Sequence, residues 1–315
     1  MRSVNGYQFR NYIVPLDFLV IRDCIVSSWA LYRSPVQWTL ERWIFSRYVA
    51  RRFTGISEER WGRGVGIWER NGRIVSVIHS EGENSGEIFF QITETDLPEE
   101  LYQAMFAFAE EHLGIEQDGF RYYALRIPHT NAAARQAAVK GGFTDSGKKE
   151  TTSMLDLGKG IPAPLPGMPP GLKLVPAAVW PDHESWGEAH ARAFGYYGRE
   201  SLPGAAARRD LYLHAPDYRP DLDLSIINAA EETAAFCIAW YDAVNRIGIL
   251  EPVGTIPDYR RMGLGRAVIH EAARRLRKLG ATHLLVGSDQ PFYARLGFTP
   301  AAWYEIWEKK IGSAE

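Results

Sequence analysis

The chain has 315 residues, which is long for one compact domain and predicts two. Hydrophobic residues make up 46% and charged residues 23%, as is usual for a globular protein in water. The formal net charge of −2 argues against a nucleic-acid-binding surface, and we expect no signal peptide or membrane span because no apolar run is long enough. We therefore expect a cytoplasmic protein whose partners include neither nucleic acid nor a membrane.

The first half of the chain predicts a mixture of helices and strands. Residues 64–81 predict a hairpin that turns at Asn71-Gly72, a dipeptide typical of tight two-residue turns. The other expected elements are helices at 17–32, 37–53, 98–114 and 131–143, and strands at 87–93, 120–127 and 150–157.

A segment rich in proline and glycine separates the two halves. Residues 158–171 contain five prolines and four glycines, a density that neither a helix nor a central strand tolerates. This predicts a first domain at 1–157, a stiff linker at 158–171 and a second domain at 172–315.

The second half repeats a similar order of elements. We expect strands at 171–177, 223–229, 233–242, 246–256, 283–288 and 303–311, and helices at 183–195, 206–218, 265–280 and 291–298. The segments AAVKGGF at 137–143 and YARLGF at 293–298 are alike. The two halves therefore resemble a diverged internal duplication.

The pattern R-x-x-G-x-G joins a predicted strand to the long predicted helix of the second half. Gly263 and Gly265 permit a tight turn and let an anion approach the backbone. A helix start presents unpaired N–H groups and partial positive charge, and Arg260, Arg261 and Arg266 add charged donors. The pattern predicts a pyrophosphate cradle; a surface helix with solvated arginines is the alternative.

The sequence EPVGTIPDYRRMGLGRAVI at 251–269, followed by GATHLLVGS and FYARLGF, resembles the GNAT superfamily of acyl-CoA-dependent N-acetyltransferases. The resemblance covers most of the second half. It implies an α/β (α+β) fold of two tandem GNAT-like domains, each a central mixed, mostly antiparallel sheet flanked by helices. It also implies acetyl-CoA as the co-substrate.

The resemblance assigns the contacts of the co-substrate to backbone and side-chain groups. Main-chain groups of Val253 and Thr255 would bind the pantetheine arm, and Ser288 stands where the family often has an asparagine that contacts CoA. The pyrophosphate would lie on the backbone amides of Met262, Gly263, Leu264, Gly265 and Arg266.

An interior proline, Pro252, lies in the strand predicted at 246–256 and would cost it a ladder hydrogen bond. A bulge or a splayed strand would accommodate it. In the GNAT superfamily this strand does part from its neighbour and opens a wedge for the acyl thioester, so the local chemistry agrees with the resemblance.

Acetyl transfer to an amine requires that the attacking ammonium lose a proton, and protonation assists the departing thiolate. The resemblance implies that Glu251 is the general base and that Tyr293 is the acid. A surface carboxylate and a packing tyrosine are the alternatives. No cysteine stands where a covalent acyl intermediate would need one, which predicts direct transfer in a ternary complex.

The matching junction in the first half, residues 92–105, contains neither glycine nor arginine. Asp96, Pro98 and Glu99 predict an N-cap, an early helical proline and the glutamate of a capping box. Glu94 and Glu100 add negative charge that would repel a pyrophosphate. We therefore expect the first domain to be a degenerate GNAT-like domain without CoA.

The acceptor is the part of the reaction that the sequence leaves open. Residues 193–200, Tyr212 and Tyr218 fall where the resemblance places the border of the acceptor pocket, although packing is the simpler reading. We expect a primary amine of a small molecule or peptide, no metal, and a monomer or homodimer. The alternatives are a non-catalytic acyl-CoA-binding sensor and a protein-interaction module on the same scaffold.

Overall fold

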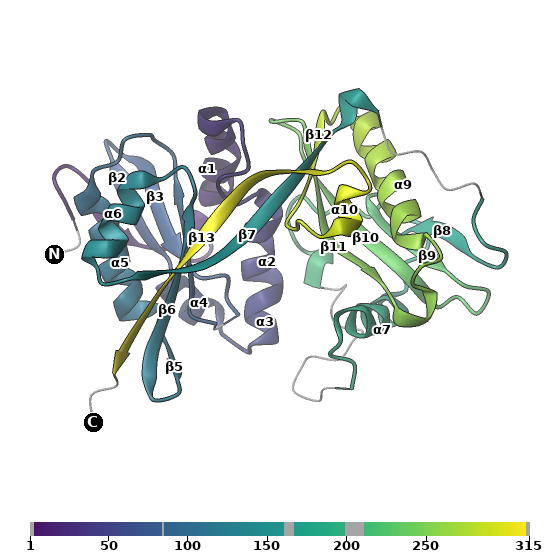
Figure 1. Ribbon diagram of the computed structural model, residues 1–315, viewed down its shortest axis with the longest axis horizontal. Helices are drawn as coiled ribbons and strands as arrows, with labels where there is room; N and C mark the ends of the chain where they lie inside the picture. The colour runs from purple at the N-terminus through teal and green to yellow at the C-terminus, as the bar shows by residue number, and fades with distance from the viewer. Residues whose placement is uncertain (1–2, 84, 161–166, 199–210, 313–315) are drawn as a thin grey trace. The chain divides into compact units, whose positions relative to one another are not determined.

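The computed structural model describes residues 3–83, 85–160, 167–198 and 211–312 (Figure 1). The chain divides into two compact units. Unit 1 comprises Met1–Thr151 and Ala301–Glu315, and unit 2 comprises Thr152–Pro300. None of the helices in these described ranges is long and apolar enough to cross a membrane.

Unit 1 is a sheet flanked by helices (Figure 1). Its strands are β1 (Gln8–Asn11), β2 (Gly66–Arg70), β3 (Arg73–His79), β4 (Glu87–Ile92), β5 (Ile115–Gln117), β6 (Phe120–Pro128), and most of β7 (Thr144–Asp156) and β13 (Thr299–Gly312). Its helices are α1 (Asp17–Tyr32), α2 (Leu40–Phe45), α3 (Arg51–Phe53), α4 (Glu58–Arg63), α5 (Glu99–His112) and α6 (Ala132–Lys140).

The strands of unit 1 follow the order β1-β2-β3-β4-β6-β13-β7, and β5 pairs with β6. The β4–β6 pair is parallel, whereas the β1–β2, β2–β3, β3–β4 and β6–β13 pairs are antiparallel. The hairpin predicted at 64–81 is confirmed: Asn71 and Gly72 have φ of 53° and 72°, as a two-residue turn between β2 and β3 requires. The helix predicted at 37–53 runs from Leu40 but contains a π-helical turn at Ser46–Ala50.

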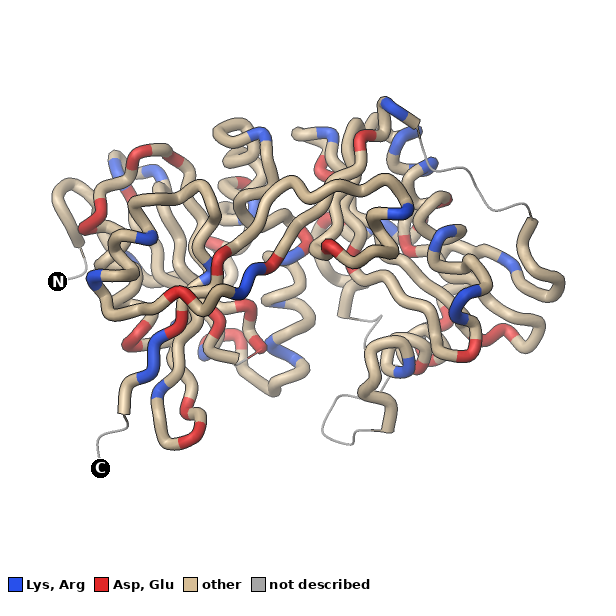
Figure 2. The backbone as a smooth tube through the Cα atoms, viewed as in Figure 1, with Lys and Arg blue, Asp and Glu red and all other residues tan. Residues whose placement is uncertain are grey.

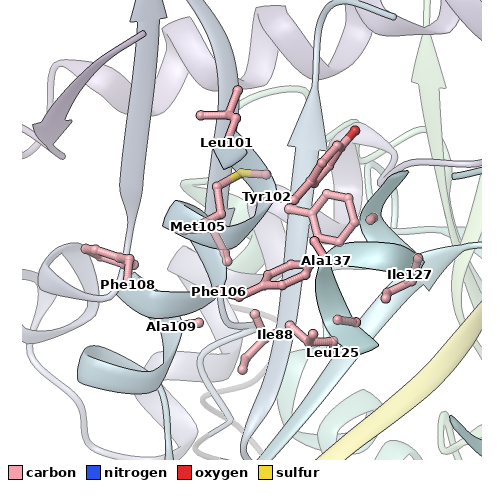
Figure 3. Packing of buried hydrophobic residues seen from close by; sticks show 14 of the residues in the cluster. Ile88, Leu101, Tyr102, Met105, Phe106, Phe108, Ala109, Leu125, Ile127 and Ala137 are labelled. Atoms are coloured by element: carbon pink, nitrogen blue, oxygen red, sulfur yellow. The ribbon is translucent and has the colours of Figure 1, made fainter. Parts of the chain in front are cut away.

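The core of unit 1 lies between its sheet and α5. Figure 3 shows Met105 and Phe106 of α5 packed near Ile88 of β4 and Leu125 of β6. All four side chains are at most 2% exposed. Burial of such side chains stabilises the fold by roughly 1.5–3 kcal/mol each.

Unit 2 also consists of sheet strands flanked by helices. Its strands follow the order β7-β12-β11-β10-β9-β8, in which only β11–β12 is parallel. The strands are β8 (Lys173–Pro176), β9 (Asp223–Ile227), β10 (Thr233–Asp242), β11 (Ile247–Thr255) and β12 (His283–Val286). Its helices are α7 (His183–Phe194), α9 (Leu264–Leu279) and α10 (Pro291–Ala294), with 3-10 turns at Leu157–Lys159 and Pro257–Tyr259.

Helix α9 has the apolar face that the sequence predicts. Val268, Ile269, Ala272, Ala273 and Leu276 are at most 1% exposed. The helix ends at Gly280, whose φ of 102° is left-handed and lets the Ala281 N–H donate to Leu276 O. The expected fold class, helices around mixed and mostly antiparallel sheets, is thus confirmed. Part of the helix expected at 206–218 lies outside the described residues.

The structure divides the chain differently from the predicted boundaries. Strand β7 leaves unit 1 at Thr151, and its residues Ser153–Asp156 pair with β12 in unit 2. Strand β13 pairs along Tyr304–Gly312 with β6 of unit 1, although the sequence places this strand in the second domain. The last strand of each half of the chain therefore pairs with a strand of the other half. The boundary between the units lies at residues 151–152, before the proline-rich segment, and not within that segment.

Candidate functional site

Strand β11 is irregular at its centre. Opposite β10, Val253 pairs with Cys237 and Leu250 pairs with Ala239, so two residues of β11, Glu251 and Pro252, oppose one residue of β10. This is the bulge that an interior proline predicts. The Trp240 indole N–H donates to the Glu251 carbonyl oxygen at 2.8 Å and holds the bulge in place.

Beyond the bulge, β11 separates from β12. The parallel pairing ends at Ile249, opposite Leu285, and no later β11–β12 pair exists among the described residues. The Ile256 N–H donates to Ala234 O on β10. By the alternation of antiparallel ladders, the N–H and C=O groups of Val253 and Thr255 point away from β10, toward the edge that β12 has left.

The chain turns from β11 into α9 through a glycine. Gly263, with φ of 82°, is the N-cap of α9 and provides no side chain to cap the helix. The N–H groups of Leu264 and Gly265 in the first turn have no acceptor within the helix. Because the helix dipole adds partial positive charge there, this start suits an anion.

Gly265 keeps the helix start close to its neighbours. A Cβ at this position would lie 3.2 Å from Phe292 Cζ and 3.4 Å from Thr255 Oγ1. The cradle, the edge of β11 and the start of α10 are therefore adjacent, and a side chain at residue 265 would crowd them. These features fit a pyrophosphate joined to an extended arm, the shape of CoA.

The arginines of the predicted cradle differ in their contacts. Arg260 donates to Thr255 O at 3.2 Å and to Ala193 O at 3.1 Å, so it ties the loop to the end of α7. Arg192 of α7 donates to Asp258 at 2.5 Å and adds a second tie. Arg261 and Met262 are exposed. The loop is thus anchored at Arg260, and both Arg260 and Arg261 contribute exposed positive charge.

Tyr293 and Glu251 come from different elements, α10 and β11. Tyr293 is buried, and Glu251 is half-buried. Burial raises the pKa of the Tyr293 phenol above its ordinary value, with smaller contributions from Cys237 and from the Glu251 carboxylate. The two predicted site residues therefore interact electrostatically, and the raised pKa leaves the phenol protonated at neutral pH, as an ordinary tyrosine also is.

Cys237 lies nearer to this site than the sequence suggests, because it stands opposite Val253 in the β10–β11 ladder. Its side chain is fully buried, and burial raises the pKa of the thiol. A protonated thiol is a poor nucleophile. The register of the hairpin between β10 and β11 is the signal that could have revealed this proximity.

Ser288, by contrast, forms hydrogen bonds with residues next to it in the sequence. Its N–H donates to Val286 O at 2.9 Å, and its hydroxyl accepts from the Gln290 N–H at 3.3 Å. Among the described residues no hydrogen bond joins Ser288 to Met262–Arg266. Its predicted CoA contact stays a prediction.

The tyrosines expected at the acceptor border pack in unit 2. The ring centroids of Tyr212 and Tyr218 lie 5.9 Å and 6.3 Å from that of Trp240. The Tyr218 hydroxyl donates to the Asp223 carboxylate at 2.7 Å. Of the segment 193–200, residues 199 and 200 lie outside the described part of the chain.

The junction in unit 1 lacks the self-cap that the sequence predicts. The N-cap of α5 is Pro98, with no side-chain cap, and not Asp96. Asp96 has φ of 59° and lies two residues before the cap. Glu99 reaches Lys140 at 2.7 Å instead of the backbone, so the capping box is wrong as well. The acidic first turn, with Glu99 and Glu100, remains.

Comparisons with known proteins agree with this geometry. Residues 224–300 match the family model described as Acetyltransferase (GNAT) domain. A GCN5-related N-acetyltransferase from Sphaerobacter thermophilus superposes with a TM-score of 0.65 at 16% identity, over 99% of this chain and 98% of that one. A tandem GNAT protein from the clavulanic acid biosynthesis pathway superposes with a TM-score of 0.62 at 14% identity, over 98% and 100%. No curated protein sequence shows a significant match.

These findings define a protein of two tandem units with the GNAT fold. The segment of unit 2 that carries the bulge, the separated edge and the glycine turn lies within the match to the GNAT domain, so the resemblance predicted from residues 251–298 is confirmed. Within the described ranges, no group of three or more His, Cys, Asp or Glu side chains could hold a metal ion.

Proposed function

We propose that unit 2 is an N-acetyltransferase that transfers an acetyl group from acetyl-CoA to a primary amine of a small molecule or peptide. One observation carries this proposal: the separated edge of β11 leads directly to an uncapped, glycine-started helix inside the segment that matches the GNAT domain. The edge suits an extended amide chain, and the helix start suits a pyrophosphate.

Each part of the co-substrate would be held by a different group. Val253 and Thr255 would bind the pantetheine arm through their main chains. The amides from Met262 to Arg266 would bind the pyrophosphate, and the exposed Arg261 would add a charged donor. Once bound, acetyl-CoA would supply an activated acetyl thioester.

Two side chains would move the protons of the reaction. Glu251 would accept a proton from the acceptor ammonium, directly or through a water molecule. The Tyr293 phenol, which is protonated at neutral pH, would donate a proton to the departing thiolate. Since the Cys237 thiol is also held protonated, direct attack by the amine is favoured over an acyl-cysteine route.

Calorimetric titration with acetyl-CoA tests the binding half of this proposal. We expect one site per chain, and we expect Gly263→Glu to weaken binding at least about tenfold, because it puts a carboxylate and a side chain at the left-handed helix start. Gly312→Glu is the matched control, since a side chain there meets no atom within 4 Å. No binding by the wild-type chain would contradict the proposal.

Thiol release from acetyl-CoA in the presence of a panel of primary amines tests the chemical half. We expect amine-dependent release by the wild-type chain and a large loss in Glu251→Gln. Binding of acetyl-CoA without release for any amine would favour the non-catalytic sensor instead. This outcome differs from loss of binding, so the two halves of the proposal can fail separately.

A further inference from the structure

Strand β4 of unit 1 repeats the separation seen in β11. Its parallel pairing with β6 covers only Glu87 and Ile88. The Thr93 N–H donates to Val75 O on β3 at 3.0 Å. By the same alternation, the N–H and C=O groups of Ile92 point away from β3, toward the edge that β6 has left. Unit 1 therefore has the strand edge that unit 2 presents at Val253 and Thr255.

A side chain of the protein itself fills this edge. The Gln37 Nε2 donates to Ile92 O at 2.8 Å, and the Ile92 N–H donates to Gln37 Oε1. One primary amide thus satisfies both main-chain groups of Ile92, as the amide of an extended ligand would. Gln37 is 7% exposed, so water does not replace these bonds.

The segment that carries Gln37 is held firmly on β4. Trp38 N–H donates to the Gln91 side-chain oxygen at 3.0 Å, so a glutamine of each segment bonds the backbone of the other. The Trp38 ring packs against His79 and Phe89, with centroid distances of 4.3 Å and 4.7 Å. The contacts of Trp38 therefore hold the neighbouring Gln37 in position at the edge of β4.

A cavity remains beside Gln37. Its volume is about 390 Å³, and it is lined by residues that include Gln37, Ile92, Leu97, Tyr102 and Asn131. The helix beyond it, α5, begins after a proline and carries two acidic residues in its first turn. Space for a ligand arm is present, while its edge contacts are already taken.

We propose that Gln37 is an internal substitute for a ligand amide, which occupies the ligand-binding edge of β4 and closes unit 1 to the pantetheine arm of acyl-CoA. This would account for the absence of CoA binding that the sequence predicts for unit 1 by an occupied groove and not only by the missing glycine turn. The proposal concerns unit 1 alone and does not depend on acetyl transfer by unit 2, because its readout is the Ile92 amide.

Hydrogen exchange at the Ile92 amide tests the proposal in the full chain, by NMR with isotope-labelled isoleucine. In Gln37→Ala we expect this amide to exchange at least about fivefold faster than in the wild-type chain, because its acceptor is gone. Addition of millimolar pantetheine should restore protection in this variant. In the wild-type chain pantetheine should leave the Ile92 amide unchanged.

Gln37→Met is the matched control, since it keeps the volume of the side chain and loses the amide. We expect fast exchange at Ile92 that pantetheine does not reverse, because the groove stays filled. Perturbation of Ile92 by pantetheine in the wild-type chain would overturn the proposal without any variant. Failure of pantetheine to protect Ile92 in a folded Gln37→Ala chain would also overturn it.

Discussion

Tyr293 is buried and interacts electrostatically with Glu251. If its phenol donates the proton to the departing thiolate, Tyr293→Phe should lower kcat by about 10²–10⁴-fold and leave the affinity for acetyl-CoA nearly unchanged. Steady-state kinetics together with calorimetric titration would measure both quantities.

Tyr241→Phe is the control for this prediction. The Tyr241 hydroxyl donates to Leu279 O at 2.9 Å, at the far end of α9 from the cradle. Its loss should cost a little stability and leave kcat unaltered. An unchanged kcat in Tyr293→Phe would show that the tyrosine only packs against Phe292 and Phe298, its ring neighbours.

His79 makes the stability of unit 1 depend on pH. It is fully buried among aromatic rings, and burial lowers its pKa to about 4, opposed only by its hydrogen bond to Ser80 O. The unfolded chain, with a histidine pKa of about 6.5, therefore takes up a proton that the folded chain refuses as the pH falls below 6.5. Folding stability is complete above that pH and declines below it.

Between pH 7 and pH 5 this linkage should cost unit 1 about 2 kcal/mol of unfolding free energy. His79→Gln, which has no titrating ring, should lose most of that dependence, whatever its stability at pH 7. Urea unfolding followed by tryptophan fluorescence would measure it, because Trp38 and Trp43 contact the His79 ring. An equal pH dependence in the two proteins would refute the assignment, and the half-buried His129 supplies the control His129→Gln.

At the scale of elements, the two units differ most where a strand meets a helix. Strands β4 and β11 both leave their parallel neighbours early, so each unit has a strand edge without a neighbouring strand, which Gln37 fills in unit 1. Helix α9 begins at a left-handed glycine, whereas α5 begins after a proline and two acidic residues follow. The two units thus differ in a few residues at the junction between strand and helix, and these residues predict an anion site in unit 2 and none in unit 1.

Local patterns in the sequence were sufficient to predict several of the turns, helices and strands correctly. The dipeptide Asn71-Gly72, the apolar face of α9 and the interior proline of β11 each act through neighbours within a few residues, and each gave the correct structure. The capping box of α5 was wrong because the Glu99 carboxylate accepts from Gln103, four residues away, and from Lys140, which is 41 residues away. Local spacing shows the first of these competitors but not the second, which only the tertiary fold brings close.

The same limit applied to the candidate site. The glycine turn and the edge of β11 were predicted from consecutive residues. The contacts of Gln37 with Ile92 and of Cys237 with Val253 depend on which strands pair and in what register. The spacing of residues does not indicate the contact of Gln37 with Ile92, which joins segments 55 residues apart, whereas the pairing of Cys237 with Val253 could be found only from the register of the β10–β11 hairpin.

At the scale of the whole molecule, the closing strands make the two halves depend on each other. Trp307 lies in the half of the chain that carries the GNAT domain, yet on β13 it pairs with Leu125 of β6 and belongs to the core of unit 1. A truncation near the C-terminus would therefore damage the unit formed mainly by the first half. The domain boundaries predicted from the sequence would instead assign this damage to unit 2.

Trp307→Ala tests this placement. Because the side chain is 9% exposed within the core of unit 1, its loss should destabilise that unit by about 3–5 kcal/mol. Hydrogen exchange measured by mass spectrometry should quicken in β6 and leave β10 of unit 2 protected. Trp303→Ala, at a site that is 36% exposed on the same strand, should have a smaller effect. Faster exchange in β10 with β6 unaltered would instead place β13 in the sheet of unit 2.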